Sequence, residues 1–451
     1  VDGAEFAQYA IRQGAAGVVG IAAGAEIARR DLGDLPVPFF AVENPRAELA
    51  RLAPRVYPGQ PETLVAVTGT NGKTSTAHFL RQLWEAAGHR AATFGTTGVE
   101  GEGFEEPLSH TTPEPITLHR LLSRLAVNGC THAAMEASSH GLAQHRLDGV
   151  TLSAAGLGNI TRDHMDYHDS HEDYVAAKLR LFGDVLGPGG VAVLNADDPV
   201  FPAARALADG RGQPVISVGR SSADLRIVGA RFTNDGQEVD FAWDGVRRTA
   251  KLALVGAFQA ENVALALGLA IATGVSAEAG FAALSDLTGV KGRMERVARR
   301  ENGAAIYVDY AHTPAALQSA IEALRPHCAG RLVVVFGAGG DRDPGKRPLM
   351  GRAVAIRADH GIVTDDNPRT EDPAAIRRAI LAACPEADEI ANRTEAILNG
   401  VDALKSPDDC LLIAGKGHEQ GQVVGGEILP FDDGEQARAA VVALDGLGPN
   451  A

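Results

Sequence analysis

The chain has few cysteines and no long apolar run, and both absences limit the classes of protein to which it can belong. Its four cysteines, Cys130, Cys328, Cys384 and Cys410, are scattered, with no C-x-x-C spacing that would indicate a metal site or a redox pair. We therefore expect reduced thiols in a cytoplasmic protein. No apolar run approaches the roughly 20 residues that span a bilayer, so membrane insertion is not expected. The sequence also shows no internal repeats and no low-complexity tracts.

An excess of basic residues is also missing. The net charge is −15, so we expect no nucleic-acid surface, and an anionic substrate must be met by local basic side chains. A length of 451 residues indicates roughly three domains. Abundant glycine suits an α/β protein with many strand-to-helix turns.

The chain divides into three blocks, with boundaries expected at 1–60, 61–297 and 298–451. The first block predicts a helix at Ala4–Gln13 and a strand at Gly17–Ile21, followed by a proline-punctuated linker. In the other two blocks, apolar runs alternate with helical periods, which predicts mostly parallel sheets with crossover helices. The runs are Val65–Thr68, Ala133–Met135, Ala154–Leu157, Val191–Leu194, Ile306–Val308, Leu332–Phe336, Gly361–Thr364 and Leu411–Ala414.

Polar, glycine-containing loops follow the strands predicted in the third block. In open α/β sheets, the loops at the carboxyl ends of the strands converge on one crevice. We therefore expect one cluster of polar side chains from loops far apart in the sequence. Its expected members are Asp309, Asp341, Arg342, Asp366, Arg369, Lys416, His418 and Glu419.

The loop after the first apolar run of the second block has the layout of a nucleotide phosphate site. Its glycines let backbone N–H groups converge on phosphate oxygens, Lys73 supplies a charge near the β- and γ-phosphates, and Thr74 or Ser75 offers a hydroxyl to Mg²⁺. Val67 stands where the general phosphate-loop pattern has its first glycine, so an ordinary strand-turn-helix is the alternative. The loop residues are Gly69, Thr70, Asn71 and Gly72.

Three more residues are candidates for metal and phosphate chemistry. Glu136 closes an apolar strand and could ligate the Mg²⁺ that bridges the phosphates, although a polar residue often ends a strand at the surface. His164 lies among two histidines and two aspartates and is a candidate ligand for a second cation, an unusual one because Mg²⁺ prefers oxygen. Lys178 by itself is typical of a lysine whose stem lies along an amphipathic helix.

Nine motifs occur in an order that resembles the Mur ligase family, in particular its diaminopimelate-adding (MurE) type. The resemblance covers nearly the whole chain. The motifs are G-T-N-G-K-T-S, E-A-S-S-H-G-L, N-I-T-R-D-H-M-D-Y-H, A-A-K-L-R-L-F, V-K-G-R-M-E, V-D-Y-A-H-T-P, G-G-D-R-D-P-G-K-R-P, D-N-P-R and A-G-K-G-H-E.

The resemblance implies an α/β fold with the three-domain Mur ligase architecture, in which a central P-loop ATPase-like parallel sheet is followed by a C-terminal Rossmann-like domain. The first domain would bind the UDP substrate, the second ATP and the third the amino acid. The family usually has a further N-terminal stretch carrying part of the uridine pocket, and this chain begins at Val1 inside that domain, so we expect a truncated start.

For ATP, the resemblance implies binding by residues 69–75 with Mg²⁺ at Thr74, Ser75 and Glu136. It also implies a second Mg²⁺ at His164 and carbamylation of Lys178 by CO₂, which makes Lys178 an oxygen ligand. Lys73, Glu136, His164 and Lys178 would be the catalytic residues. Further ATP contacts are implied for Asn262, Arg293 and Asp309, and Gln259 stands where the family more often has Asn.

For the other two substrates, the resemblance implies two sets of residues. UDP-N-acetylmuramoyl-L-alanyl-D-glutamate would contact Thr111, Thr112, Ser138, Gln144 and Arg146. The diaminopimelate set would be Arg342, Asp366, Asn367, Pro368, Arg369, Gly415 and Glu419. meso-2,6-Diaminopimelate is lysine with an extra carboxylate, which a guanidinium binds in a bidentate way, while Glu419 can hold the distal ammonium.

The implied reaction is ATP-dependent amide formation through an acyl phosphate, shielded from water by closure of the third domain. We expect a cytoplasmic monomer. Three alternatives stay open: a Mur ligase that adds L-lysine, an enzyme like folylpolyglutamate synthase, and a non-catalytic regulator that binds ATP. The D-N-P-R and A-G-K-G-H-E motifs argue against the first two.

Overall fold

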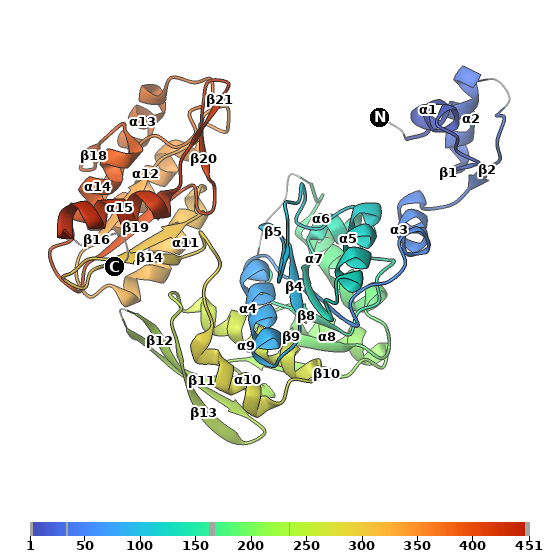
Figure 1. Cartoon of the computed structure of the whole chain (residues 1–451), viewed down its shortest axis with the longest axis horizontal. Helices are drawn as coiled ribbons and strands as arrows, with labels where there is room; N and C mark the ends of the chain where they lie inside the picture. Colours follow the sequence, from blue (N-terminus) through green and yellow to red (C-terminus); the bar gives the residue numbers. More distant parts are fainter. Residues whose placement is uncertain (1–2, 33–34, 162–166, 234, 447–451) are drawn as a thin grey trace. The chain divides into compact units, whose positions relative to one another are not determined.

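The computed structural model describes residues 3–32, 35–161, 167–233 and 235–446. The chain forms two compact units, shown in Figure 1: unit 1 comprises Val1–Val218 and Leu265–Ser276, and unit 2 comprises Gly219–Ala264 and Ala277–Ala451. Within the described ranges, no helix combines the length and the apolarity that a membrane span requires.

Unit 1 begins with a small α/β part in which two short strands pair in parallel. The proline-punctuated stretch was expected to be a linker, but it contains helix α3. A proline fits the first turn of a helix, because the N–H that it lacks would have no partner within the helix there. The side chain of Asn44 caps this helix by accepting from the backbone N–H groups of Arg46 and Ala47. The elements are η1 (Gly3–Phe6), α1 (Ala7–Arg12), β1 (Val18–Gly20), α2 (Ala22–Leu32), β2 (Phe39–Ala41) and α3 (Pro45–Val56).

The main sheet of unit 1 has the strand order β10-β9-β8-β3-β7-β4-β5-β6. Strands β10 to β4 in this order run parallel, and β5 and β6 are antiparallel to their neighbours. The strands are β3 (Thr63–Thr68), β4 (Ala91–Gly95), β5 (Gly98–Gly101), β6 (Phe104–Glu106), β7 (His132–Glu136), β8 (Ala154–Leu157), β9 (Val191–Asn195) and β10 (Val215–Gly219).

Helices cover both faces of this sheet, which explains why its parallel strands are mostly apolar. Leu64 and Ala66 of β3 pack in a core with Leu118 and Leu121 of α5. On the other face, the side chain of Leu269 of α9 lies beside Gly156 of β8. The helices are α4 (Lys73–Ala86), α5 (Pro115–Val127), α6 (Ser139–Ala143), α7 (His171–Arg180), a π-helical turn (Leu181–Val185), α8 (Phe201–Gly210) and α9 (Phe258–Ala272).

Unit 2 contains an antiparallel three-stranded meander and a six-stranded sheet of order β14-β15-β19-β16-β17-β18. Only the edge strand β14 of the second sheet is antiparallel to its neighbour. The strands are β11 (Leu225–Thr233), β12 (Gly236–Trp243), β13 (Val246–Leu252), β14 (Glu295–Arg299), β15 (Ala305–Asp309), β16 (Leu332–Phe336), β17 (His360–Val363), β18 (Asp388–Glu389), β19 (Cys410–Ala414), β20 (Gly421–Val424) and β21 (Glu427–Pro430).

The six-stranded sheet is covered by helices on both faces, as in a doubly wound fold. Val334 of β16 packs in one core with Leu317 of α11 and Met350 of α12. Val335 packs in the other core with Ile397 of α14. The helices are α10 (Ala277–Ala283), η3 (Leu284–Asp286), α11 (Pro314–Leu324), η4 (Arg325–His327), α12 (Lys346–Arg357), α13 (Pro373–Leu381), α14 (Arg393–Asp402) and α15 (Asp433–Asp445).

The expected α/β class is confirmed, and each apolar run named above lies in a strand or overlaps one. The meander β11–β13 was not predicted. The helix expected around Lys178 ends as α-helix at Arg180 and continues as the π-helical turn.

Candidate active site

The phosphate loop lies between β3 and α4 in unit 1, with Gly69 and Gly72 at positive φ (153° and 82°). These angles explain why glycine occupies both positions, because residues with a side chain rarely adopt them. The ammonium of Lys73 donates to the carbonyls of Gly69 (3.1 Å) and Thr70 (2.8 Å). The loop is also tied to the end of β8, because the side chain of Asn159 accepts from the N–H of Asn71 at 3.1 Å.

Glu136 lies at the end of β7, next to the phosphate loop, and is 2% exposed. Its Oε1 accepts from the hydroxyl of Thr74 at 2.9 Å and from the backbone N–H of Thr96 at 2.8 Å. A Cβ on Gly95 would lie 2.0 Å from this oxygen. The carboxylate is therefore held in a space that a glycine leaves open, beside the hydroxyl expected to bind metal.

Lys178 on α7 is buried, with 1% of its surface exposed. Its ammonium donates to the carbonyl of Gly69 at 2.7 Å and lies 4.6 Å from the ring centre of Tyr174. The Tyr174 hydroxyl in turn lies 2.8 Å from that of Thr70. The structure thus places Lys178 at the phosphate loop rather than at the helix surface.

The residues expected to contact the UDP substrate form a hydrogen-bonded group in unit 1. The hydroxyl of Thr112 lies 3.0 Å from that of Ser138. Arg146 donates to the carbonyl of Thr112 at 2.6 Å and to the side chain of Gln144 at 2.8 Å. Thr111 lies 3.3 Å from Thr96, hydroxyl to hydroxyl.

Two further residues of unit 1, His164 and Ser75, were predicted to bind metal. His164 lies outside the described residues. Ser75 is buried in the first turn of α4, directly after Thr74. Within the described ranges, no group of three or more His, Cys, Asp or Glu side chains is placed to hold a metal ion.

In unit 2, Asn367 is the centre of the expected amino-acid site. Its Oδ1 accepts from the ammonium of Lys416 (2.8 Å) and from the N–H of Val423 (2.9 Å). Two donors on one atom fix the orientation of the amide, so its Nδ2 donates to Oε2 of Glu419 at 3.0 Å. Lys416 is fully buried, and burial lowers its pKa.

Arg369, two residues later, has a φ of 51°, which is uncommon for an L-residue. Its guanidinium donates to the carbonyl of Gly340 at 2.7 Å, and its backbone pairs with Val423 of β20. Pro368, between Asn367 and Arg369, is buried. Arg342 is exposed on the loop that follows β16.

Asp366 is 7% exposed, and its Oδ2 has no hydrogen-bond partner. A Cβ on Gly415, whose φ is 123°, would lie 2.4 Å from this oxygen. The carboxylate of Asp366 interacts electrostatically with Lys346, Arg393 and Lys416, while its Oδ2 stays open to a hydrogen-bond donor of a ligand.

The residues further along the chain that are expected to contact ATP form two local groups. Asp309 ends β15 and accepts from the N–H groups of Met294 (2.7 Å) and Ala311 (2.9 Å), and burial raises its pKa. The guanidinium of Arg293 lies 4.8 Å from the ring centre of Tyr310. Asn262 donates to Gln259 at 3.0 Å on α9.

Comparisons with known proteins identify the family. Residues 67–270 match the Mur ligase middle domain, and residues 292–417 match the Mur ligase, glutamate ligase domain. A UDP-N-acetylmuramoyl-L-alanyl-D-glutamate–2,6-diaminopimelate ligase of Bradyrhizobium diazoefficiens is 51% identical over 447 residues, which cover 98% of this chain and 90% of that relative. The chain belongs to the Mur ligase family.

Comparisons with solved structures agree that the chain has the Mur ligase fold. A UDP-N-acetylmuramoyl-L-alanyl-D-glutamate–2,6-diaminopimelate ligase structure matches with a TM-score of 0.74 and 33% identity, covering 98% of this chain and 89% of that one. A Mycobacterium tuberculosis folylpolyglutamate synthase in complex with ADP and AMPPCP matches with a TM-score of 0.65 and 18% identity, covering 90% and 97%. The second match shows a shared fold alone.

Three residues of this Mur ligase site were not singled out by the sequence analysis. Gly95 and Thr96 adjoin Glu136 only because β4 pairs in parallel with β7, with Phe94 opposite Met135. Tyr174 was visible only as an aromatic four residues before Lys178, a spacing that places both on one face of a helix. None of the three belongs to a motif with a known spacing rule.

Proposed function

We propose that this chain is an ATP-dependent amide ligase that joins meso-2,6-diaminopimelate to UDP-N-acetylmuramoyl-L-alanyl-D-glutamate in peptidoglycan precursor synthesis. The 51% identity to a ligase of that name over nearly the whole chain carries the proposal. The geometry fits it, because the Arg369 guanidinium, Oδ2 of Asp366, which has no hydrogen-bond partner, and Glu419 lie around the D-N-P-R loop. These groups suit a substrate with two carboxylates and two ammonium groups.

The phosphate loop would bind ATP, with backbone N–H groups of residues 69–72 and the ammonium of Lys73 on the phosphates. The donor set also fits Mg²⁺, since Thr74 and Glu136 offer a hydroxyl and a carboxylate side by side. Thr74, Ser75 and Glu136 would hold the ion together with phosphate oxygens. When bound, Mg²⁺ neutralises charge on the transferring phosphoryl group.

Lys178 would complete this region as a carbamate. The ammonium would first lose one proton, and the neutral amine would then add CO₂ and lose a second proton, which replaces a buried cation by an oxygen ligand. Its position beside the Gly69 carbonyl supports this role. We retain His164 as a proposed ligand of a second Mg²⁺. Asn262, Arg293 and Asp309 are proposed to contact ATP as well.

The reaction balances in two steps. The D-glutamyl carboxylate attacks the γ-phosphorus, which forms an acyl phosphate and releases ADP. The diaminopimelate amine then attacks the acyl carbon and loses a proton, and inorganic phosphate leaves. The protein contributes position and charge: Lys73 at the phosphates, Gln144 and Arg146 at the muramoyl substrate, and Arg369 and Glu419 at the acceptor.

We also propose the domain boundaries 1–60, 61–297 and 298–451, a cytoplasmic location and a monomeric state. No binding of nucleic acid is proposed, in line with the net charge of −15.

The test is phosphate release from ATP with the UDP substrate and a panel of acceptor amino acids. Release that depends on meso-diaminopimelate and is at least about 100-fold weaker with L-lysine supports the proposal. Stimulation by L-lysine instead would indicate the related lysine ligase. ATP binding without stimulation by any amino acid would indicate a regulator.

A further inference from the structure

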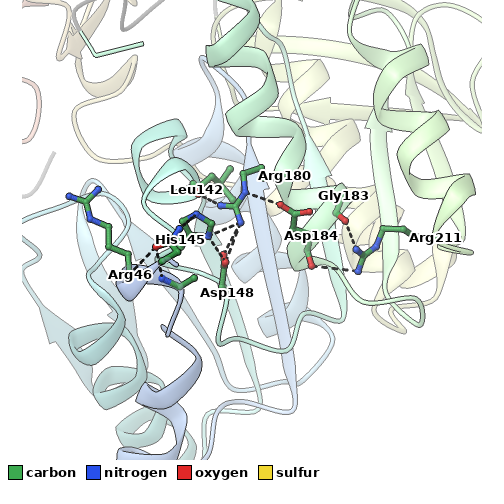
Figure 2. Close-up of polar contacts among 10 residues, drawn as sticks. Arg46, Leu142, His145, Asp148, Arg180, Gly183, Asp184 and Arg211 are labelled. Carbon is green, nitrogen blue, oxygen red and sulfur yellow. Dashed lines mark hydrogen bonds and ion pairs between the residues drawn. The ribbon is translucent and has the colours of Figure 1, made fainter. Parts of the chain in front are cut away.

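The guanidinium of Arg180 ties helix α7 to the loop that carries Gln144 and Arg146. Arg180 lies two residues after Lys178, and Figure 2 shows its guanidinium among Leu142, His145, Asp148 and Asp184. Its Nη1 donates to the carbonyl of Leu142, and its Nη2 donates to the carboxylate of Asp148 at 3.1 and 3.3 Å. The third nitrogen, Nε, donates to Asp184 at 2.8 Å.

His145 lies between Gln144 and Arg146 and has a φ of 61°, so its backbone conformation is uncommon for an L-residue. Its Nδ1 lies 2.6 Å from Oδ2 of Asp148, and its Nε2 lies 2.8 Å from Nδ2 of Asn44. Contacts on both ring nitrogens hold the ring in one position.

The cap of helix α3 also fixes the contact of Asn44 with His145. Oδ1 of Asn44 accepts from the N–H groups of Arg46 and Ala47, which leaves Nδ2 to face His145. Nδ1 of His145 lies within hydrogen-bond distance of both Oδ2 of Asp148 (2.6 Å) and Nη2 of Arg180 (2.9 Å). His145 thus joins helix α3 to Asp148 and to Arg180.

These contacts connect residues expected to serve different parts of the reaction. Gln144 and Arg146 hydrogen-bond to each other, and Arg146 donates to Thr112, on the side expected to bind the UDP substrate. Lys178, on the same helix as Arg180, contacts the phosphate loop. We name Asn44, His145, Asp148 and Arg180 the Arg180 network.

We propose that the Arg180 network positions the UDP-substrate loop and the Lys178 helix relative to each other, with Arg180 and Asp148 as positioning residues. This proposal rests on the proposed function. Arg180 is suited to the role because its planar fork addresses a backbone carbonyl and a carboxylate at once, which a lysine cannot do with one ammonium. The side chains of Arg180 and Asp148 are 21% and 22% exposed, so water screens their ion pair only in part.

The test uses Arg180→Gln, Arg180→Lys and Asp148→Asn in the full chain, with KM measured separately for the three substrates. We expect KM for the UDP substrate to rise about 10- to 100-fold in Arg180→Gln and Asp148→Asn, the cost of one or two charge-assisted hydrogen bonds. KM for diaminopimelate should change less than about twofold, because Asn367 and Glu419 belong to unit 2 and the network to unit 1. Arg180→Lys should recover only part of the loss.

A second readout follows the Lys178 carbamate directly. With ¹³C-bicarbonate, Arg180→Gln should show a weaker carbamate ¹³C signal than the wild type at equal bicarbonate. The double variant Arg180→Gln with Asp148→Asn should lose no more than the larger single loss, because both changes break the same contact.

Two matched controls have the same helical geometry. Arg205 pairs with Asp209 at i,i+4 on α8, as Arg180 pairs with Asp184, but both side chains are about half exposed. Arg205→Gln should leave all three KM values unchanged. Asp184→Asn removes the one contact of Arg180 outside the loop and should also leave them unchanged.

Equal changes in all three KM values, or unchanged KM values and carbamate signal in folded variants, would overturn the proposal. If Arg180→Gln does not fold, Asp148→Asn and Arg180→Lys carry the same test. A wild type without diaminopimelate-dependent phosphate release would contradict the proposed function instead. In that case the carbamate signal and the dissociation constant of the UDP substrate, measured by calorimetry, still decide the role of the network.

Discussion

Single residues decide whether the phosphate site can form, and Gly95 shows this most directly. The register of β4 against β7 places Gly95 beside Glu136, where a Cβ would lie 2.0 Å from Oε1. No rotation of a methyl group relieves such a contact, so the carboxylate itself must move. The hydrogen bond from the Thr74 hydroxyl to Glu136 would then be lost.

Gly95→Ala should therefore raise the Mg²⁺ concentration needed for half-maximal activity by about 10-fold or more, at a stability cost of roughly 1–3 kcal/mol. An Mg²⁺ titration of phosphate release, with a thermal melt to confirm folding, measures both effects. The control is Gly210→Ala at the end of α8, where an added Cβ meets nothing within 4 Å. A normal Mg²⁺ titration for Gly95→Ala would show that the position of Glu136 does not limit metal binding.

Lys416 is a second buried residue with a specific role, since its ammonium helps to orient the amide of Asn367. Lys416→Met keeps the length of the side chain but removes the donor to Asn367. The amide then keeps only the donor from Val423, and Glu419 loses its ion pair with Lys416 at 3.7 Å. We expect KM for diaminopimelate to rise about 10-fold, since one charged hydrogen bond is worth roughly 1.5–3 kcal/mol. KM for ATP should stay constant. If both KM values rise equally, Lys416 supports the fold of unit 2 rather than the acceptor site.

At the scale of elements, strand β7 begins with a buried histidine and ends with Glu136. The ring of His132 stacks on that of His89 at 4.0 Å and meets Trp84 edge-on at 5.1 Å. Burial, followed by the charge of His89, lowers the pKa of His132 from 6.5 to about 4. The unfolded chain therefore takes up this proton near pH 6.5, and the folded chain does not until about pH 4.

The contribution of His132 to the free energy of unfolding is fully present above pH 6.5. It falls as the pH drops toward 4, by up to about 1.4 kcal/mol per pH unit for one proton. His132→Phe keeps an aromatic ring and should flatten the pH dependence of the apparent unfolding free energy between pH 6.5 and 4.5. Urea unfolding across this range measures the slope. His110→Gln, at an exposed loop position, should leave the slope as it is in the wild type. An unchanged slope in His132→Phe would contradict the prediction.

The sequence predicts elements well where one signal dominates. Parallel strands covered on both faces, such as β3, β16 and β19, are continuous apolar runs and were found with small errors at their ends. The meander β11–β13 was missed because its burial alternates irregularly and its exposed positions carry charges such as Arg247 and Lys251. Of the site, motifs predict the phosphate loop, Glu136 and the D-N-P-R loop. They cannot predict Gly95 or the Arg180 network, which depend on strand register and on contacts between distant segments.

At the scale of the whole molecule, the two units divide the chemistry between them. Unit 1 holds the phosphate loop, Lys178 and the group around Arg146, which are the parts proposed to make the acyl phosphate. Unit 2 holds the D-N-P-R loop and Glu419, proposed to bind the acceptor amine. A change confined to the acceptor loop should therefore spare the first half of the reaction and damage the second.

Arg369→Ala is the variant that tests this division. Removing a bidentate contact of roughly 2–5 kcal/mol should lower kcat/KM for diaminopimelate by about 30- to 5,000-fold. Activity with L-lysine should fall much less, since lysine lacks the distal carboxylate. Arg369→Lys should recover little, because an ammonium keeps the charge but loses the planar fork.

Acyl phosphate formation should survive in the same variant. Positional isotope exchange in ¹⁸O-labelled ATP, measured with the UDP substrate and without amino acid, should stay within about threefold of the wild type, because Arg369 belongs to unit 2 and the phosphate loop to unit 1. Arg352→Ala, at an exposed position of α12, is the matched control and should behave as the wild type in both assays. If Arg369→Ala leaves the ratio of kcat/KM for diaminopimelate and lysine unchanged, Arg369 does not bind the distal carboxylate. If it abolishes isotope exchange as well, the acceptor loop takes part in both halves of the reaction, and the division between the units is wrong.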